Sequence, residues 1–63
     1  MKHYRFGYVD VVNGWTRVFE CNAYDLNGAF YLFGTEMEIR HGRNAHERLI
    51  LLEVLENGVS VNW

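Results

Sequence analysis

The residues with the clearest potential for chemistry are two histidines, His41 and His46, which have acidic neighbours at Glu36, Glu38 and Glu47. Imidazole and carboxylate groups are common zinc ligands. Helical histidine pairs that bind a metal are four residues apart, whereas these two are five positions apart and lie across a predicted loop. The pattern therefore favours solvent-exposed histidines, and we expect no metal site.

A catalytic thiol is a second option, because the chain contains one cysteine, Cys21. A reactive cysteine needs a nearby cation or base to stabilise its thiolate. The hairpin register given below places Cys21 beside Phe6 on an aromatic face, where a thiol is usually a small, inert hydrophobic group. The sequence also lacks a glycine-rich phosphate loop, a G-x-S-x-G motif and a convergent pair of carboxylates. We expect no enzyme activity, no catalytic residue and no cofactor.

Nucleic-acid binding is a third option, because arginines beside exposed aromatic rings can hold single-stranded bases. The arginines are Arg5, Arg17, Arg40, Arg43 and Arg48. A single lysine and a net charge of −2 argue against broad neutralisation of phosphates. Arg40, Arg43 and Arg48 do gather around the predicted loop after the helix, where they could contact a phosphate or an acidic protein surface. Nucleic acid is therefore the alternative partner rather than the first.

Length and composition limit the classes of protein to consider. A chain of 63 residues forms one small domain, 1–63, and such a domain buries only about 60% of its unfolded surface. One cysteine allows no intramolecular disulfide, and the N-terminus lacks the layout of a signal peptide. No apolar run approaches the ~20 residues needed to cross a bilayer. We expect a cytoplasmic protein, in the host cytoplasm if it is phage-encoded, with no membrane partner.

The first element expected to position these residues is a hairpin centred on Asn13-Gly14, because this dipeptide suits a two-residue type I′ turn. The predicted pairs on one face are Asp10 with Arg17, Tyr8 with Phe19, Phe6 with Cys21, and Tyr4 with Ala23. The opposition of Asp10 and Arg17 supports this register. The other face carries Arg5, Gly7, Val9, Val11, Thr16, Val18, Glu20 and Asn22. One face is therefore aromatic and the other mixed.

A helix follows, with Asp25 as its N-cap and His41-Gly42 as its C-terminal stop. Its apolar face consists of Leu26, Ala29, Phe30, Phe33 and Met37, which fall within an arc of about 100°. The segment 35–41 also alternates with a period of two, so the alternative is a helix that ends at Phe33 and an extra short strand over 35–41.

A second hairpin is predicted around Asn57-Gly58, which pairs Glu56 with Val59. In this register Ile50, Leu52, Val54 and Trp63 lie on the face covered by the helix, and Leu51, Glu53 and Leu55 lie on the other. The alternative is a helix capped by Asn44 with Glu47 at its third position. The predicted fold class is α+β, a small antiparallel sheet of two Asn-Gly hairpins with one helix packed on one face, in the order β-β-α-β-β.

These elements assign most of the aromatic residues to the core and leave two outside it. Trp15 lies at the tip of the first hairpin and Tyr31 lies about 140° around the helix from Leu26, so both are candidate anchors for a partner. One helix covers only one side of a sheet. The other side retains five aliphatic residues, Val9, Val11, Val18, Leu51 and Leu55, which form a candidate interface with a polar rim.

We therefore expect a stand-alone protein-binding module that occludes the surface of a larger protein, or of a second copy in a homodimer. The candidate partner-binding residues are the five aliphatic ones, Trp15, Tyr31, Arg40, Arg43 and Arg48. Small, mildly acidic α+β chains of this kind are typical of phage and mobile-element inhibitors of host machinery, anti-CRISPR proteins among them, which is a likeness of type alone. The alternatives are a nucleic-acid-binding accessory protein and a small structural subunit of an assembly.

Overall fold

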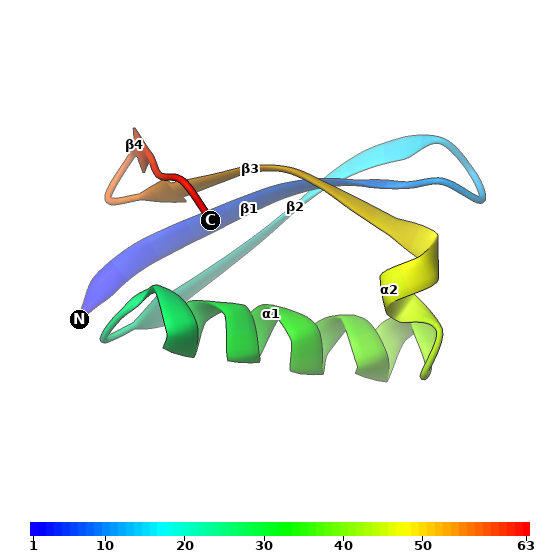
Figure 1. Cartoon of the computed structure of the whole chain (residues 1–63), viewed down its shortest axis with the longest axis horizontal. Coiled ribbons are helices and arrows are strands. Elements are labelled where there is room, and N and C mark those ends of the chain that lie inside the picture. Colours follow the sequence, from blue (N-terminus) through cyan, green and yellow to red (C-terminus); the bar gives the residue numbers. More distant parts are fainter.

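A computed structural model describes residues 1–63 and confirms the predicted α+β fold (Figure 1). The elements are β1 (Lys2–Asp10), β2 (Trp15–Ala23), α1 (Leu26–His41), α2 (Ala45–Arg48), β3 (Leu49–Glu56) and β4 (Val59–Ser60). The strands form one antiparallel sheet in the order β2-β1-β3-β4. Helix α1 lies along one side of this sheet and no element covers the other side (Figure 1). We call the uncovered side the open face.

Helix α1 begins and ends where its capping residues predict. The Asp25 carboxylate accepts a hydrogen bond from the backbone N–H of Gly28 at 2.8 Å, which satisfies one of the free donors of the first turn. Gly42 follows the last residue with a φ of 80°, and its N–H donates to the carbonyl of Glu38 at 2.7 Å. The helix is continuous through 35–41, so the alternative strand does not form. Neither helix combines the length and apolar character needed to cross a bilayer.

The core lies between β1 and α1 and is built mainly from aromatic rings. Tyr4, Phe6 and Tyr8 alternate along β1 toward the helix and are fully buried. The Phe6 ring stacks on Phe33 with centroids 4.7 Å apart and meets Phe30 edge-on at 5.2 Å. Such pairs contribute beyond simple apolar burial, by about 0.5–1.5 kcal/mol each. Most of the aromatic residues therefore build the core, as predicted.

The first hairpin has a different register from the predicted one. Asp10 pairs with Trp15, not with Arg17, and four residues, Val11 to Gly14, form the loop. The other core-side pairs are Tyr8 with Arg17, Phe6 with Phe19, and Tyr4 with Cys21. The shift is by two positions, so every side chain keeps its predicted face although every predicted pair, including the Asp10–Arg17 charge pair, was wrong.

Strand β3 contains a β-bulge that the sequence did not reveal. Gly7 pairs with Glu53 and Tyr8 pairs with Leu51, which leaves Leu52 without a partner on β1. A single extra residue reverses which side chains face the helix on one side of the bulge. Leu51 packs against the buried core beneath α1. The prediction that Leu51 lies on the open face was therefore wrong.

The bulge also exposes two residues that were expected in the core. Ile50 is 54% exposed and Leu52 is 52% exposed. Ile50 pairs with Val9, an open-face residue of β1. The open face thus gains Ile50 in place of Leu51, and its apolar character is preserved.

The second hairpin has the predicted register but is short. Asn57 and Gly58 both adopt positive φ, 50° and 83°, as a type I′ turn requires, and Glu56 pairs with Val59. The pairing extends to a hydrogen bond from the Val61 N–H to the carbonyl of Val54 at 2.9 Å. Trp63 is 59% exposed, so its predicted place in the core was wrong. Of the alternative helix after Asn44, only the single turn α2 forms.

Candidate functional site

The open face carries a contiguous cluster of aliphatic side chains near the first hairpin. Val9 lies at the centre of the register, opposite Thr16 on β2 and Ile50 on β3. Val18 is the diagonal neighbour of Val9 on β2, and Leu52 follows Ile50 on β3. Val9 is half-buried and the other three are exposed. We call these four residues, Val9, Val18, Ile50 and Leu52, the open-face patch.

Beyond this patch the open face becomes polar. Arg5 lies opposite Glu20 on one side and Leu55 on the other. His3 forms an ion pair with Glu20 at 3.2 Å when its ring is protonated. Leu55 is half-buried here and is separated from the open-face patch along β3 by Glu53. Leu55 therefore belongs to the polar rim, whereas Val11 continues the apolar end as an exposed residue of the hairpin loop.

Gly7 leaves space on the open face that a neighbouring side chain fills. It pairs with Val18 on β2 and Glu53 on β3, and it has no side chain of its own. The Cγ atom of Glu53 lies 3.4 Å from the position that a Cβ of residue 7 would occupy. The aliphatic part of Glu53 thus covers the glycine, and the patch has a charged group directly at its border.

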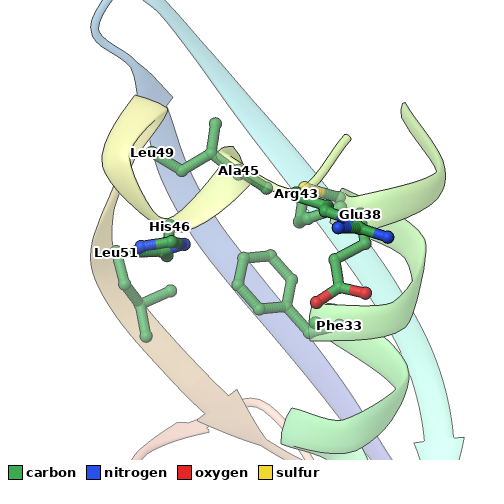
Figure 2. Close-up of a pocket in the computed structure, with 9 residues that line it drawn as sticks. Phe33, Glu38, Arg43, Ala45, His46, Leu49 and Leu51 are labelled. Atoms are coloured by element: carbon green, nitrogen blue, oxygen red, sulfur yellow. The ribbon is translucent and has the colours of Figure 1, made fainter. Parts of the chain in front are cut away.

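A second surface feature is an apolar cavity of about 280 Å³ between α1, α2 and β3. Figure 2 shows Phe33 from α1, His46 from α2 and Leu51 from β3 around it. Met37, Ala45 and Leu49 add apolar surface, and Glu38, Arg43 and His46 supply polar groups. Arg43 is thus separated from the other two arginines of its predicted cluster. A cavity of this size accepts one apolar side chain of a partner or a small ligand.

A third feature is a polar cavity of about 270 Å³ between the first hairpin and the C-terminal end of α1. Three arginines line it: Arg17 from β2, Arg40 from α1 and Arg48 from α2. Tyr8, Asp10 and His41 also contribute to its walls. We call it the arginine cavity. His41 and His46 therefore line different cavities, and no group of three or more His, Cys, Asp or Glu side chains is placed to hold a metal ion.

Asp10 anchors the arginine cavity. Its carboxylate is buried, and both of its oxygens accept from Arg48 Nε at 3.0 Å. The backbone N–H of Val12 donates to the same carboxylate at 3.0 Å. Burial alone raises the pKa of Asp10, but the hydrogen bonds from Val12 and Arg48 and the Arg48 charge outweigh it and lower the pKa below its usual value. Asp10 therefore stays ionised and fixes the Arg48 guanidinium in place.

Two further titratable groups lie at the opposite end of the sheet. Burial and a 2.6 Å hydrogen bond to Glu56 raise the pKa of the Tyr4 hydroxyl to about 12. Partial burial raises the pKa of the Cys21 thiol. A raised pKa lowers the thiolate fraction, so the half-buried Cys21 lacks the electrostatic activation of a nucleophile.

The two predicted aromatic anchors are both on the surface. Trp15 starts β2, and the Arg17 guanidinium carbon lies 4.9 Å from the centre of the Trp15 ring. Tyr31 is 74% exposed on α1, away from the sheet. Neither ring belongs to the open-face patch. The predicted partner-binding residues are thus distributed over several surfaces and do not form one site.

Sequence reasoning missed Ile50 and Leu52 on the open face, and Tyr8 and Asp10 in the arginine cavity. The first two are exposed because of the bulge, which leaves no mark in a run of four apolar residues, Leu49 to Leu52. Asp10 could have been found from its position before Val11, Val12 and Asn13, because aspartate at the start of a turn accepts bonds from the following backbone.

No protein-family model, curated protein or solved structure matches this chain.

Proposed function

We propose that this protein is a protein-binding module and that the open face of its sheet contacts the partner. The observation that carries the proposal is the open-face patch, four aliphatic side chains that are contiguous in the register and lie on the side of the sheet opposite α1. Contiguous apolar surface with a polar rim is typical of interaction sites on small proteins.

The charged residues around the open-face patch indicate what kind of surface the partner should present. The rim contains both signs of charge, with Arg5 and His3 beside Glu20, and Glu53 at the border of the patch. An interface of this kind places apolar contacts at the centre and charges at the periphery, where they set orientation more than affinity. The partner should therefore present an apolar surface with few charges at its centre.

We expect the partner to be a larger protein whose surface this chain blocks. The two cavities described above are small for a chain of 63 residues to use in chemistry, whereas blocking a partner surface is an activity that its size permits. Phage and mobile-element inhibitors of host enzymes act in this way, and host enzymes of the cytoplasm are the first partners to test.

The direct test is a charge within the open-face patch, Val18→Glu. The side chain points away from α1, so the isolated fold should remain intact. A buried carboxylate without a partner costs about 3 kcal/mol or more, which is a loss of affinity of about a hundredfold. The measurement is affinity capture from a nuclease-treated lysate with the tagged wild-type and variant proteins, followed by titration of the captured protein.

Val59→Glu is the matched control, because Val59 is also an exposed valine but lies outside the open-face patch. It should bind like the wild type. Light scattering on each protein shows whether the partner is a second copy, since Val18→Glu would then convert a dimer to a monomer. A wild-type monomer whose partner binds Val18→Glu with full affinity would contradict the proposal.

A further inference from the structure

The arginine cavity holds more positive charge than its own acidic group neutralises. Arg17, Arg40 and Arg48 line it, and Asp10 is the single carboxylate among its lining residues. We propose that this cavity binds a phosphate dianion, either free or as the monoester of a small molecule. The site is separate from the open face, because the core-side residues of β1 and β2 form it together with α1 and α2.

The guanidinium groups retain free donors. Arg48 donates to Asp10 through Nε, and Arg40 donates to Glu36 through Nε at 3.0 Å. Both arginines thus use one edge for the protein and leave their terminal nitrogens without a protein acceptor. A guanidinium carries five N–H donors, and its terminal pair matches two oxygens of a phosphate. The two ion pairs therefore orient the arginines without consuming their capacity to bind an anion.

Arg17 has no carboxylate partner at all. Its only specific contact is with the face of the Trp15 ring. Stacking on an aromatic ring holds a guanidinium in position and leaves its in-plane N–H groups free. Arg17 is therefore the arginine that supplies a full uncompensated charge to the cavity.

The second observation is the hydroxyl of Tyr8. Tyr8 lines the cavity, its side chain is fully buried, and no protein group forms a hydrogen bond with its hydroxyl oxygen. A buried hydroxyl without a hydrogen-bond partner destabilises the folded protein. A phosphate oxygen in the cavity would accept a hydrogen bond from this hydroxyl and so provide its missing partner.

Complementing the helix dipole does not account for the cluster. The C-terminal end of α1 carries a partial negative charge, which Arg40 and His41 offset from the last turn. Arg17 comes from a different element, β2, and lies beside Tyr8 in the register. The convergence of cations from β2, α1 and α2 on one recess is what indicates a ligand.

The charge distribution favours a small phosphate over a nucleic acid. Nucleic acids are bound along tracks of cations that follow the backbone. Here Arg5 lies on the open face, Arg43 lines the apolar cavity, and Lys2 pairs with Glu56 at the other end of the sheet. No track extends from the arginine cavity, so the site fits one phosphate group.

The experiment is a titration of the full chain followed by backbone amide NMR at constant ionic strength. The probes are inorganic phosphate, methyl phosphate, acetate and a ten-nucleotide oligothymidylate. We expect saturable shifts with phosphate at the amides of Gly14, Arg17, His41 and Gly42. Arg17→Gln should weaken phosphate binding about tenfold or more, because a charge-assisted hydrogen bond is lost.

Tyr8→Phe removes only the orphan hydroxyl. The unliganded variant should be at least as stable as the wild type, yet it should bind phosphate several-fold more weakly. Arg5→Gln is the matched control, because it removes the same charge on the open face and should leave binding unchanged. Saturation by methyl phosphate assigns the site to a monoester, and saturation by inorganic phosphate alone assigns it to the free ion.

Four outcomes would overturn the proposal. They are the absence of saturable phosphate binding, equal binding of acetate, equal losses in Arg5→Gln and Arg17→Gln, and tighter binding of oligothymidylate than of methyl phosphate.

Discussion

The two hairpins of this protein share the dipeptide Asn-Gly and use it differently. In the second hairpin, Asn57 and Gly58 are the whole loop and both have positive φ. In the first, Gly14 has a φ of 74°, but Asn13 is outside the left-handed region and the loop has four residues. The same dipeptide therefore gives a type I′ turn in one place and the end of a longer loop in the other.

Asp10 is the residue that makes the first turn differ from the second. Its carboxylate accepts from the Val12 N–H, and its carbonyl accepts from the Gly14 N–H at 2.7 Å. Arg48 holds the same carboxylate from the far side. Glu56, at the equivalent place before Asn57, has a longer side chain that accepts from the Tyr4 hydroxyl instead. The short Asp10 side chain thus accepts a hydrogen bond from the loop backbone and stabilises a four-residue loop. The longer Glu56 side chain does not, and Asn57-Gly58 alone forms the second turn.

The largest effect expected from this comparison comes from Asp10→Ala. The substitution removes the loop bonds and leaves Arg48 without its buried partner, so the first hairpin loses its anchor while the second is untouched. We expect the thermal midpoint to fall by on the order of 10–20 °C, measured by circular dichroism. Glu20→Ala, which removes an exposed carboxylate, is the control and should change the midpoint little.

The pH dependence of stability identifies the same group. The pKa of Asp10 is lowered in the folded protein, so its contribution to the free energy of unfolding is present above the unfolded value of 3.8. The contribution is lost as pH falls through the lower folded pKa. The free energy of unfolding of Asp10→Ala, measured as a function of pH, should therefore lack this loss in acid. If it falls equally in both proteins, Asp10 is not the group responsible.

A smaller effect should distinguish the two asparagines. Asn57→Ala places alanine at a φ of 50° and removes the bond from the His3 N–H to Asn57 Oδ1, so it should lower the free energy of unfolding by about 1–2 kcal/mol. Asn13→Ala loses an exposed bond from the Trp15 N–H and a long 3.4 Å bond from the Asn13 amide to Asp10, and it should lower the free energy of unfolding by less than about 1 kcal/mol. Urea denaturation measures both. Equal losses would mean that the two turns do not differ in backbone strain.

The smallest effect is expected from deleting Val11 and Val12. Asp10 and Trp15 already pair, so the deletion leaves Asn13-Gly14 as a two-residue loop between them. A shorter loop and a turn that matches the strand twist offset the lost loop bonds, and we expect a change within about 1 kcal/mol. Contacts between Asp10 and Trp15 in NMR spectra should persist. A slip of two residues in the strand pairing would refute the view that the loop alone differs.

The features that sequence reasoning predicted are those with local causes. Asp25 and Gly42 bound the helix through contacts within four residues of the chain, and Asn57-Gly58 fixes its own turn. The alternation of Tyr4, Phe6 and Tyr8 fixes which face of β1 is buried, and this survives a register shift of two. Local propensity and period were therefore sufficient for the fold class.

The features that escaped prediction depend on contacts distant in sequence. The register of the first hairpin is tied to Arg48, which is 38 residues from Asp10. The bulge at Leu52 lies in a stretch where every residue is apolar. Apolar and polar residues do not alternate there, so the sequence does not indicate which side chains face the helix. The arginine cavity brings Arg17 beside Arg40 and Arg48 only after the hairpin folds over the end of α1. Of the residues that line this cavity, the sequence pattern grouped only Arg40 and Arg48, which lie on either side of the helix-to-strand loop.

The central position of β1 has a consequence for how the chain folds. Strand β1 is bonded on one side to β2, its neighbour in sequence, and on the other to β3, as in the contact between Tyr4 and Glu56, which are 52 residues apart. Contacts of such long range form late, because they must close a long loop. Until β3 docks, the inner edge of β1 is an unpaired strand edge on which another chain can add, so refolding should be most prone to aggregation before that step. The chain contains no proline, so no slow isomerisation prolongs this interval.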